Sequence, residues 1–257
     1  MQSLTQLEMR GAQGNIACIR LTRPEKRNAL NDGLIEALHT HFDTLPAEAR
    51  VAVIHAEGDH FCAGLDLSEL RERDAVEGLF HSRRWHAAFE RIQFGPVPVI
   101  VALKGAVVGG GLELACAAHI RVADASCFYA LPEGSRGLFV GGGDSVRIPR
   151  LIGVPRMTDM MLTGRVLAAN EGHAAGVSHY LELAGGSFDK ALTLAERIAT
   201  NAPMSNYSVM HVLPRIADQG MDQGLMMESL IAAIAQSSPE AKDRLKAFLE
   251  GRAAKVR

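Results

Sequence analysis

Short apolar runs rich in β-branched residues recur through the first half of the chain and are typical of buried parallel strands. Three of them lie at residues 15–22, 51–55 and 98–103. The first follows the turn Gly11–Gly14, so we expect it to pair with a strand at residues 4–9. Because helix-like segments separate the runs, the pattern predicts an α/β fold.

Helical spacing of apolar residues fills much of the sequence between these runs. Asn31 is a suitable N-cap for a helix that extends to about Leu45, with Leu34, Ile35, Leu38 and Phe42 on one face. Residues 68–94 are charged and mostly helical by pattern, and Gly78 is expected to divide them. We interpret Trp85 in this segment as a core residue.

From residue 187 to the end the pattern is helical, with breaks at Pro203, Gly220 and Pro239. Ser238 is expected to cap the last helix, because proline is favoured at the first position of a helix. Residues 221–236 are apolar on much of the helix circumference, which favours burial against a partner subunit.

The stretch from Pro98 to Glu133 joins an apolar strand to three consecutive glycines and a helix-like segment at residues 112–118. A ligand can approach a glycine backbone closely because no Cβ intervenes. The first amides of a helix lack intrahelical partners and lie at the positive end of its dipole. Glu113 and Glu133 frame this run, so the stretch could stabilise an oxyanion between two acids.

Other interpretations of the same stretch remain open. The glycines are equally typical of a tight turn, Glu113 of an acid near a helix N-terminus, and Glu133 of a loop carboxylate. A phosphate-binding P-loop is disfavoured because Leu112 and Glu113 stand where Lys and Ser or Thr are needed. A dinucleotide fingerprint counted from Gly109 would need a glycine in place of Leu114.

A second loop follows the strand at residues 51–55 and contains Ala63 and Gly64. Ligands of open α/β folds gather at the carboxyl ends of strands, so the amides after Gly64 could face the same ligand as Gly110. Asp66 in this loop is more often a helix cap than a catalytic acid. Earlier in the chain, Arg23, Lys26 and Arg27 form a basic cluster that is either a solvated loop or a phosphate contact.

Composition narrows the class of protein. The 257 residues suffice for one large α/β domain with or without a helical tail, and the net charge of −2 argues against a general nucleic-acid binder. No signal peptide, apolar run of membrane-spanning length or metal-ligand spacing is present, so we expect a cytoplasmic protein. The cysteines lack zinc-site spacing and are expected to be free, mostly buried thiols: Cys18, Cys62, Cys116 and Cys127.

Five motifs between Arg23 and Arg165 resemble those of the enoyl-CoA hydratase/isomerase (crotonase) family. In chain order they are RPEKRNAL, FCAGLDL, GAVVGGGLELA, the PE of YALPEGSRGL, and LTGR. The resemblance implies an α/β fold with a crotonase-like ββα superhelix over residues 1–200. It further implies a C-terminal helical region, residues 201–257, for trimerisation and active-site cover, and assembly as a homotrimer or a homohexamer.

The resemblance also implies an acyl-CoA thioester substrate, whose oxygen would be held by the backbone amides of Leu65 and Gly110. Coenzyme A would arrive as part of the substrate, with no separate cofactor, no metal, no nucleic acid and no membrane partner. Further residues expected to bind the substrate are Lys26, Arg27, Ala29, Ala63, Gly64, Asp66, Leu67, Gly109 and Gly111.

The two glutamates match those that the family's hydratases use, so the resemblance implies hydration of a 2-enoyl-CoA by Glu113 and Glu133. A double-bond isomerase or another acyl-CoA lyase of the same fold is the alternative, and an acyl-CoA-binding scaffold subunit is the non-enzymatic one. Arg136 and Asp144 depart from the family pattern. They predict either a buried pair that shapes the acyl pocket or a feature for a polar substrate.

Overall fold

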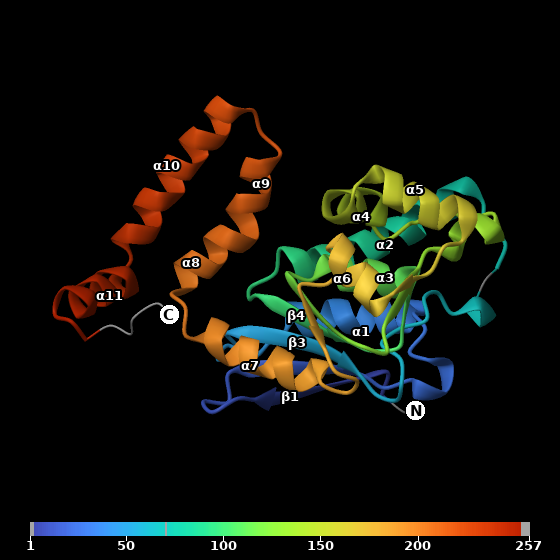
Figure 1. Cartoon of the computed structure of the whole chain (residues 1–257), viewed down its shortest axis with the longest axis horizontal. Coiled ribbons are helices and arrows are strands. Elements are labelled where there is room, and N and C mark those ends of the chain that lie inside the picture. The colour runs from blue at the N-terminus through green and yellow to red at the C-terminus, as the bar shows by residue number, and fades with distance from the viewer. Residues whose placement is uncertain (1–2, 70, 253–257) are drawn as a thin grey trace. The chain divides into compact units, whose positions relative to one another are not determined.

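The computed structural model describes residues 3–69 and 71–252. The chain forms two compact units, Met1–Ala199 and Thr200–Arg257 (Figure 1). The first unit contains every strand that the described residues form, and the second is helical.

A six-stranded sheet is the centre of the first unit, in the order β1-β2-β3-β4-β6-β9. Strand β1 is antiparallel to β2, and the remaining neighbours are parallel. The predicted strands at 15–22, 51–55 and 98–103 and the pairing with 4–9 are confirmed. The strands are β1 (Thr5–Arg10), β2 (Ile16–Leu21), β3 (Val51–Ala56), β4 (Val99–Leu103), β6 (Ile120–Asp124) and β9 (Tyr180–Glu182).

A second, three-stranded sheet has the order β5-β7-β8, with β5 parallel to β7 and β7 antiparallel to β8. Strand β4 continues almost directly into β5, and β6 into β7, so consecutive strands enter different sheets. The sequence did not predict this sheet because its strands are only two or three residues long. They are β5 (Ala106–Val108), β7 (Phe128–Ala130) and β8 (Leu167–Ala168).

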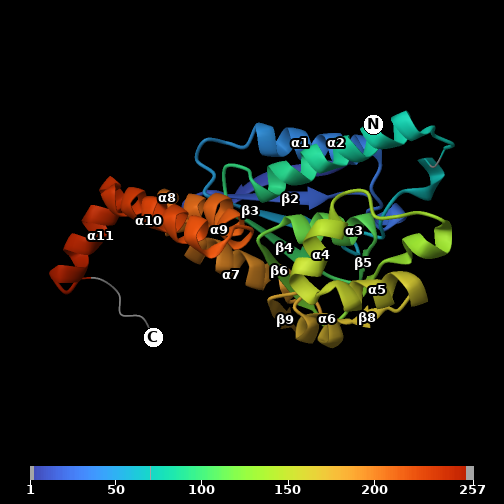
Figure 2. The ribbon, with the colours of Figure 1, turned by 90° about the horizontal axis from the view of Figure 1, so that it is seen from above.

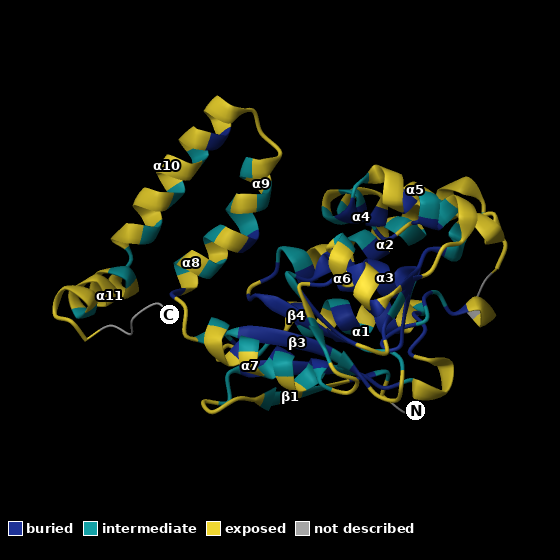
Figure 3. Cartoon of the chain, viewed as in Figure 1, coloured by how far each residue is buried: buried dark blue, intermediate teal, exposed yellow. Residues whose placement is uncertain are grey.

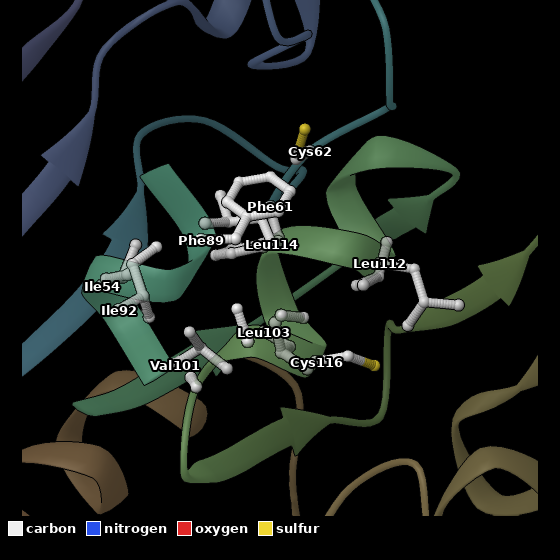
Figure 4. Close-up of a cluster of buried hydrophobic side chains, with 14 of the residues drawn as sticks. Ile54, Phe61, Cys62, Phe89, Ile92, Val101, Leu103, Leu112, Leu114 and Cys116 are labelled. Carbon is white, nitrogen blue, oxygen red and sulfur yellow. The ribbon is translucent and has the colours of Figure 1, made fainter. Parts of the chain in front are cut away.

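The two faces of the six-stranded sheet are both covered, because successive strand residues point to opposite sides. Ile19, Ile54 and Val101 face the larger core, which α1 (Asp32–Asp43), α2 (Ala75–Gln93) and α3 (Gly110–Ala117) complete. Helices α1 and α2 pack side by side (Figure 2), and the side chains of this core are shown in Figure 4. On the opposite face Cys18 and Ile100 meet α7 (Ser187–Ala199), which lies beside β3 in Figure 1.

The helix starts confirm the predicted cap Asn31 and correct one boundary. Asn31 accepts a hydrogen bond from the amide of Leu34 at 2.8 Å, as expected of the N-cap of α1. The charged segment is not helical from residue 68: after a 3₁₀-helix at Leu67–Glu69, α2 begins only at Ala75. Asp74 is its N-cap, and the helix continues through Gly78 without a break.

Three further helices complete the first unit: α4 (Asp144–Ile152), α5 (Val154–Thr163) and α6 (Ala169–Ala175). Short 3₁₀-helices also form at Pro24–Lys26 and Pro132–Arg136. The four cysteines are free and buried, as predicted. Within the described residues no helix combines the length and apolar character that crossing a membrane requires.

The second unit consists of α8 (Pro203–Tyr207), a π-helical turn (Ser208–Val212), α9 (Leu213–Ala217), α10 (Met221–Ser237) and α11 (Pro239–Leu249). The predicted breaks at Pro203, Gly220 and Pro239 are confirmed, and the Ser238 hydroxyl accepts from the amide of Ala241 at 3.2 Å. Most residues of α10 are exposed in the single chain (Figure 3), including five of its large apolar ones.

Candidate active site

A cavity of about 400 Å³ lies at the N-terminal end of α3. Four segments of the first unit line it: the loop after β3, the beginning of α2 with the loop before it, the start of α3, and the chain between β7 and α4. Both glutamates singled out in the sequence, Glu113 and Glu133, lie in its wall.

Two glycine loops, the one around Gly64 and the one at residues 109–111, lie in close contact at one side of this cavity. Gly64 has φ of +94°, and a Cβ there would come within 2.8 Å of the carbonyl oxygen of Val108 and 3.6 Å of the nitrogen of Gly110. A Cβ on Gly111 would come within 2.4 Å of the carbonyl oxygen of Cys62. The close approach of the two loops therefore requires glycine.

Two backbone amides in these loops are available to a ligand. The backbone of Leu30 donates to the carbonyl of Gly64 and accepts from the amide of Asp66. These two hydrogen bonds involve the residues before and after Leu65, and they leave the Leu65 amide without a bond to Leu30. Among the described residues, neither the Leu65 amide nor the Gly110 amide donates to a backbone or side-chain acceptor. Gly110 is the first residue of α3, where an amide has no intrahelical partner.

Glu113 is buried in the first turn of α3, with only 4% of its surface exposed. Its Oε1 accepts hydrogen bonds from the amides of Gly142, at 2.7 Å, and Asp144, at 3.4 Å. Burial raises the pKa of the Glu113 carboxyl to about 7, and the two amides only partly oppose it. Glu113 can therefore exchange a proton near neutral pH.

Glu133 lies in the 3₁₀-helix that follows β7 and is less deeply buried. One carboxylate oxygen fills the space beside Gly109, where a Cβ would be 2.6 Å from it. The other, Oε2, is buried without a hydrogen-bond partner among the described residues. Burial raises the pKa of Glu133, while its own amide and the charge of Arg136 oppose the shift.

Both carboxyls thus favour the neutral form more than an exposed glutamate does. The charge of Glu133 also raises the pKa of Glu113, so the protons of the two groups are coupled. Burial acts most strongly on Glu113. Such a pair can keep one carboxyl protonated while the other is ionised, which is what combined acid and base catalysis needs.

Asp144 is the first residue of α4 and is completely buried. Neither of its carboxylate oxygens has a hydrogen-bond partner among the described residues. Burial and the nearby Glu113 raise its pKa well above the usual range, against Arg147 and Arg121. The interpretation of Arg136 and Asp144 as a buried pair is wrong, because Arg136 is exposed.

The remaining predicted substrate-binding residues divide into two groups. Residues that line the cavity are Ala63, Gly64, Leu65, Leu67, Gly109 and Gly110. Those outside its wall are Lys26, Arg27, Ala29, Asp66 and Gly111.

The side chain of Asp66 is engaged within the protein. Hydrogen bonds from Ser68 and Arg23 lower the pKa of this carboxyl to about 2. Arg23 lies 2.8 Å from Asp66 and also donates to the carbonyl of Ala29, so it holds the basic loop against the glycine loop. Lys26 and Arg27 remain exposed.

Several residues of the cavity wall were missed by sequence reasoning. Trp85 is in the core, as predicted, but its ring also lies 2.9 Å from the Cβ position of Gly110 and lines the cavity. The hydroxyl of Ser82 donates to the carbonyl of Gly141 at 2.6 Å, joining α2 to the chain before α4. The helical spacing of Ser82 and Trp85 was the available signal, since both lie on one face.

No group of three or more His, Cys, Asp or Glu side chains suited to a metal ion occurs in the part of the chain that the structure describes.

Comparison with known proteins gives consistent results. A family model described as enoyl-CoA hydratase/isomerase matches residues 11–256. A solved structure from Rhodopseudomonas palustris, named provisionally as an enoyl-CoA hydratase, is 60% identical with a TM-score of 0.94, covering 99% of this chain and 97% of that one. An enoyl-CoA hydratase structure from Bacillus anthracis is 27% identical with a TM-score of 0.90, covering 98% of each chain. The human mitochondrial methylglutaconyl-CoA hydratase is 35% identical over 91% of this chain and 70% of its own length.

Proposed function

The chain belongs to the enoyl-CoA hydratase/isomerase family, and from that premise we propose that it adds water across the 2,3 double bond of a 2-enoyl-CoA thioester. One observation carries the proposal: Glu113 and Glu133 line the same cavity as two unpaired amides. Several relatives are named as hydratases. The name of the human relative, methylglutaconyl-CoA hydratase, specifies a CoA thioester as its substrate.

In the proposed reaction the amides of Leu65 and Gly110 donate to the thioester oxygen. This oxygen becomes an enolate as the nucleophile adds, so donors already in place stabilise the transition state more than the substrate. Loss of one such donor typically raises the barrier by about 3 kcal/mol. Trp85 and the close approach of the two loops keep these amides in position.

The two glutamates would hold one water between them. Glu113 in its ionised form takes a proton from the water, whose oxygen bonds to C3. Glu133 in its neutral form gives its proton to C2, and the product is a 3-hydroxyacyl-CoA. The coupling of the two carboxyls supports one being ionised while the other stays neutral. Burial favours the neutral form more strongly for Glu113, so the choice of Glu113 as the base and Glu133 as the acid rests on the family resemblance.

The remaining features of the proposal follow from the family. Lys26 and Arg27 would meet the phosphates of coenzyme A, which enters with the substrate, and no further cofactor is expected. The second unit would join chains into a trimer or hexamer and cover the active site. A cytoplasmic location remains our expectation, although the human relative is named as mitochondrial.

The test follows the loss of enoyl absorbance with crotonyl-CoA and with a cinnamoyl-type CoA, with products identified by chromatography. We expect 3-hydroxyacyl-CoA to form. Glu113→Gln and Glu133→Gln should each remove most turnover while acyl-CoA binding persists, and Glu36→Gln, an exposed residue of α1, serves as the control.

Other outcomes would replace this proposal. Conversion of a 3-enoyl-CoA into its 2-enoyl form without hydration would make the protein an isomerase. Near-normal turnover in either glutamine variant would remove the assigned roles. Binding of CoA esters without any reaction would favour a scaffold subunit.

A further inference from the structure

The wall of the cavity carries positive charge that the hydration reaction does not use. Arg71 and Arg73, from the loop before α2, and Arg136, from the end of the 3₁₀-helix that holds Glu133, all line it. Their segments face the same space, because the hydrogen bond from Ser82 to Gly141 ties α2 to the chain that follows Arg136. The cavity therefore has guanidinium groups from two separate elements.

Two of these arginines form neither an ion pair nor a hydrogen bond with the described residues. Arg71 pairs with Glu77 at 3.4 Å, on an exposed surface. Arg73 and Arg136 make no ion pair or hydrogen bond among the described residues, and Arg73 is half-buried. Apart from Glu113 and Glu133, no acidic side chain of the described residues lines the cavity. A planar guanidinium with free donors is suited to bind a carboxylate with two parallel hydrogen bonds.

Apolar side chains share this part of the wall. Leu67, Leu138 and Phe139 are exposed and line the cavity with the arginines. A hydrocarbon chain can cover such side chains while a charged group at its end reaches the guanidinium groups. The combination fits a ligand with an apolar middle and an anionic end.

A different basic segment, which contains Lys26 and Arg27, is available to bind the phosphates of coenzyme A. Lys26 and Arg27 are exposed and do not line the cavity. Their segment lies against the loop of Gly64 and Asp66 through the pairing of Leu30 with that loop. The cavity with Arg73 and Arg136 is therefore left for the acyl part of the substrate.

We propose that Arg73 and Arg136 bind a carboxylate at the far end of the acyl chain, so that the preferred substrate is a 2-enoyl-CoA derived from a dicarboxylic acid. This inference rests on the hydratase function proposed above. It assigns the three arginines of the cavity wall, Arg71, Arg73 and Arg136, to substrate selection, with Arg71 contributing longer-range attraction.

The experiment compares 2-hexenedioyl-CoA with 2-hexenoyl-CoA, which has the same length and no distal charge, and with crotonyl-CoA. Wild-type kcat/KM should be roughly tenfold or more higher for the diacid, since hydrogen bonds to charged groups contribute at that scale. Arg73→Met and Arg136→Met should each remove most of this preference, measured as the ratio of kcat/KM for the diacid to that for 2-hexenoyl-CoA. Crotonyl-CoA hydration should stay within about twofold in Arg73→Met, whereas Arg136→Met also removes a charge that lowers the pKa of Glu133. Arg73→Lys should retain part of the preference, because the charge is kept without the planar fork.

Arg83→Met is the matched control, because Arg83 is an exposed arginine of α2 that does not line the cavity. Crotonyl-CoA hydration with no preference for the diacid would overturn the inference and leave the hydratase function standing. An equal loss for all three substrates in the arginine variants would also overturn it, since this would indicate contact with coenzyme A. Absence of hydration with every substrate would remove the hydratase function and the inference together.

Discussion

At the scale of single residues, the site is built by burying carboxyls that would be more stable in water. Glu113 receives two amide hydrogen bonds, yet burial still raises its pKa from 4.5 to about 7. A carboxyl with a raised pKa binds its proton more tightly in the folded state. The folded state therefore loses stability relative to the unfolded state as the pH rises from about 4.5 to about 7.

We accordingly expect Glu113→Gln to be more stable than wild type at pH 8, by roughly 3 kcal/mol if the whole shift is expressed. The advantage should disappear near pH 4, where Glu113 is protonated in both states. Urea unfolding at matched protein concentration over this pH range measures it. A pH-independent difference for Glu113→Gln would contradict the assigned cause.

A second expectation concerns the space around this carboxylate. A Cβ on Gly142 would lie 2.7 Å from Oε2 of Glu113 and 2.8 Å from the ring of Phe89, so Gly142→Ala must displace one of them. Because the ring is fixed in the core, we expect the carboxylate to move and kcat to fall about a hundredfold, with KM little changed.

Gly141→Ala provides the comparison for this variant. The nearest atom to a Cβ at Gly141 is the Ser82 hydroxyl at 3.9 Å, an ordinary contact. Its loss of kcat should be much smaller. Equal losses in the two alanine variants would show that the loop as a whole, and not the carboxylate, responds to the change.

At the scale of secondary-structure elements, the late start of α2 determines which residues reach the cavity. The Asp74 side chain accepts from the amide of Glu77 at 2.8 Å, and the Glu77 carboxylate accepts from the amide of Asp74 at 3.3 Å. This capping box ends the loop that carries Arg71 and Arg73. The loop geometry therefore depends on the cap.

We expect Asp74→Ala to lower the free energy of unfolding by about 1 kcal/mol, and Asp74→Ser to recover most of it, since serine also caps helices well. Urea unfolding monitors both variants. Unchanged stability in the alanine variant would show that the remaining contacts of α2 suffice to fix its start.

Local signals explain which elements could be predicted from the sequence. Apolar runs specified β2, β3 and β4, and the caps Asn31 and Ser238 specified helix starts. The start of α2 was missed because a charged helix and a charged loop have the same composition. The short strands of the second sheet carry too few residues for a periodic signal.

The candidate site, too, could be predicted only as far as its features lie within short stretches of sequence. The glutamates and the glycine loops could be selected from motifs, because each occurs within a short stretch. The amide of Gly142 that binds Glu113 is 29 residues away, and the burial of Asp144 depends on how α4 packs against α3. Contacts between distant segments of this kind follow from tertiary packing, which no local pattern encodes.

At the scale of the whole molecule, the second unit leaves apolar residues exposed. In α10 the large exposed ones are Met221, Leu225, Met226, Leu230 and Ile234, each at least half exposed. Single-chain proteins rarely expose apolar patches of such extent. This supports the expectation that chains associate through this unit.

We therefore expect light scattering after size-exclusion chromatography to give a trimer or hexamer for the wild type. Leu230→Glu should shift the protein to smaller species, because a charge would be buried at the interface without a partner. Ser229→Glu, at the preceding residue of α10, tests whether charge alone is responsible. A monomeric wild type would remove the assembly role of α10.

The burial of all four thiols also has a practical consequence for work with the protein. Burial raises the pKa of Cys18 to about 11 and those of Cys62 and Cys127 to about 12, and it raises the pKa of Cys116 as well. Since the thiolate is the reactive form, maleimide dyes should react slowly with the native cysteines. A single cysteine introduced at exposed Leu138 would then be the preferred attachment point for a fluorophore at the mouth of the cavity. Because its own cysteines react slowly, the natural sequence can be labelled at one introduced cysteine for fluorescence measurements of substrate entry.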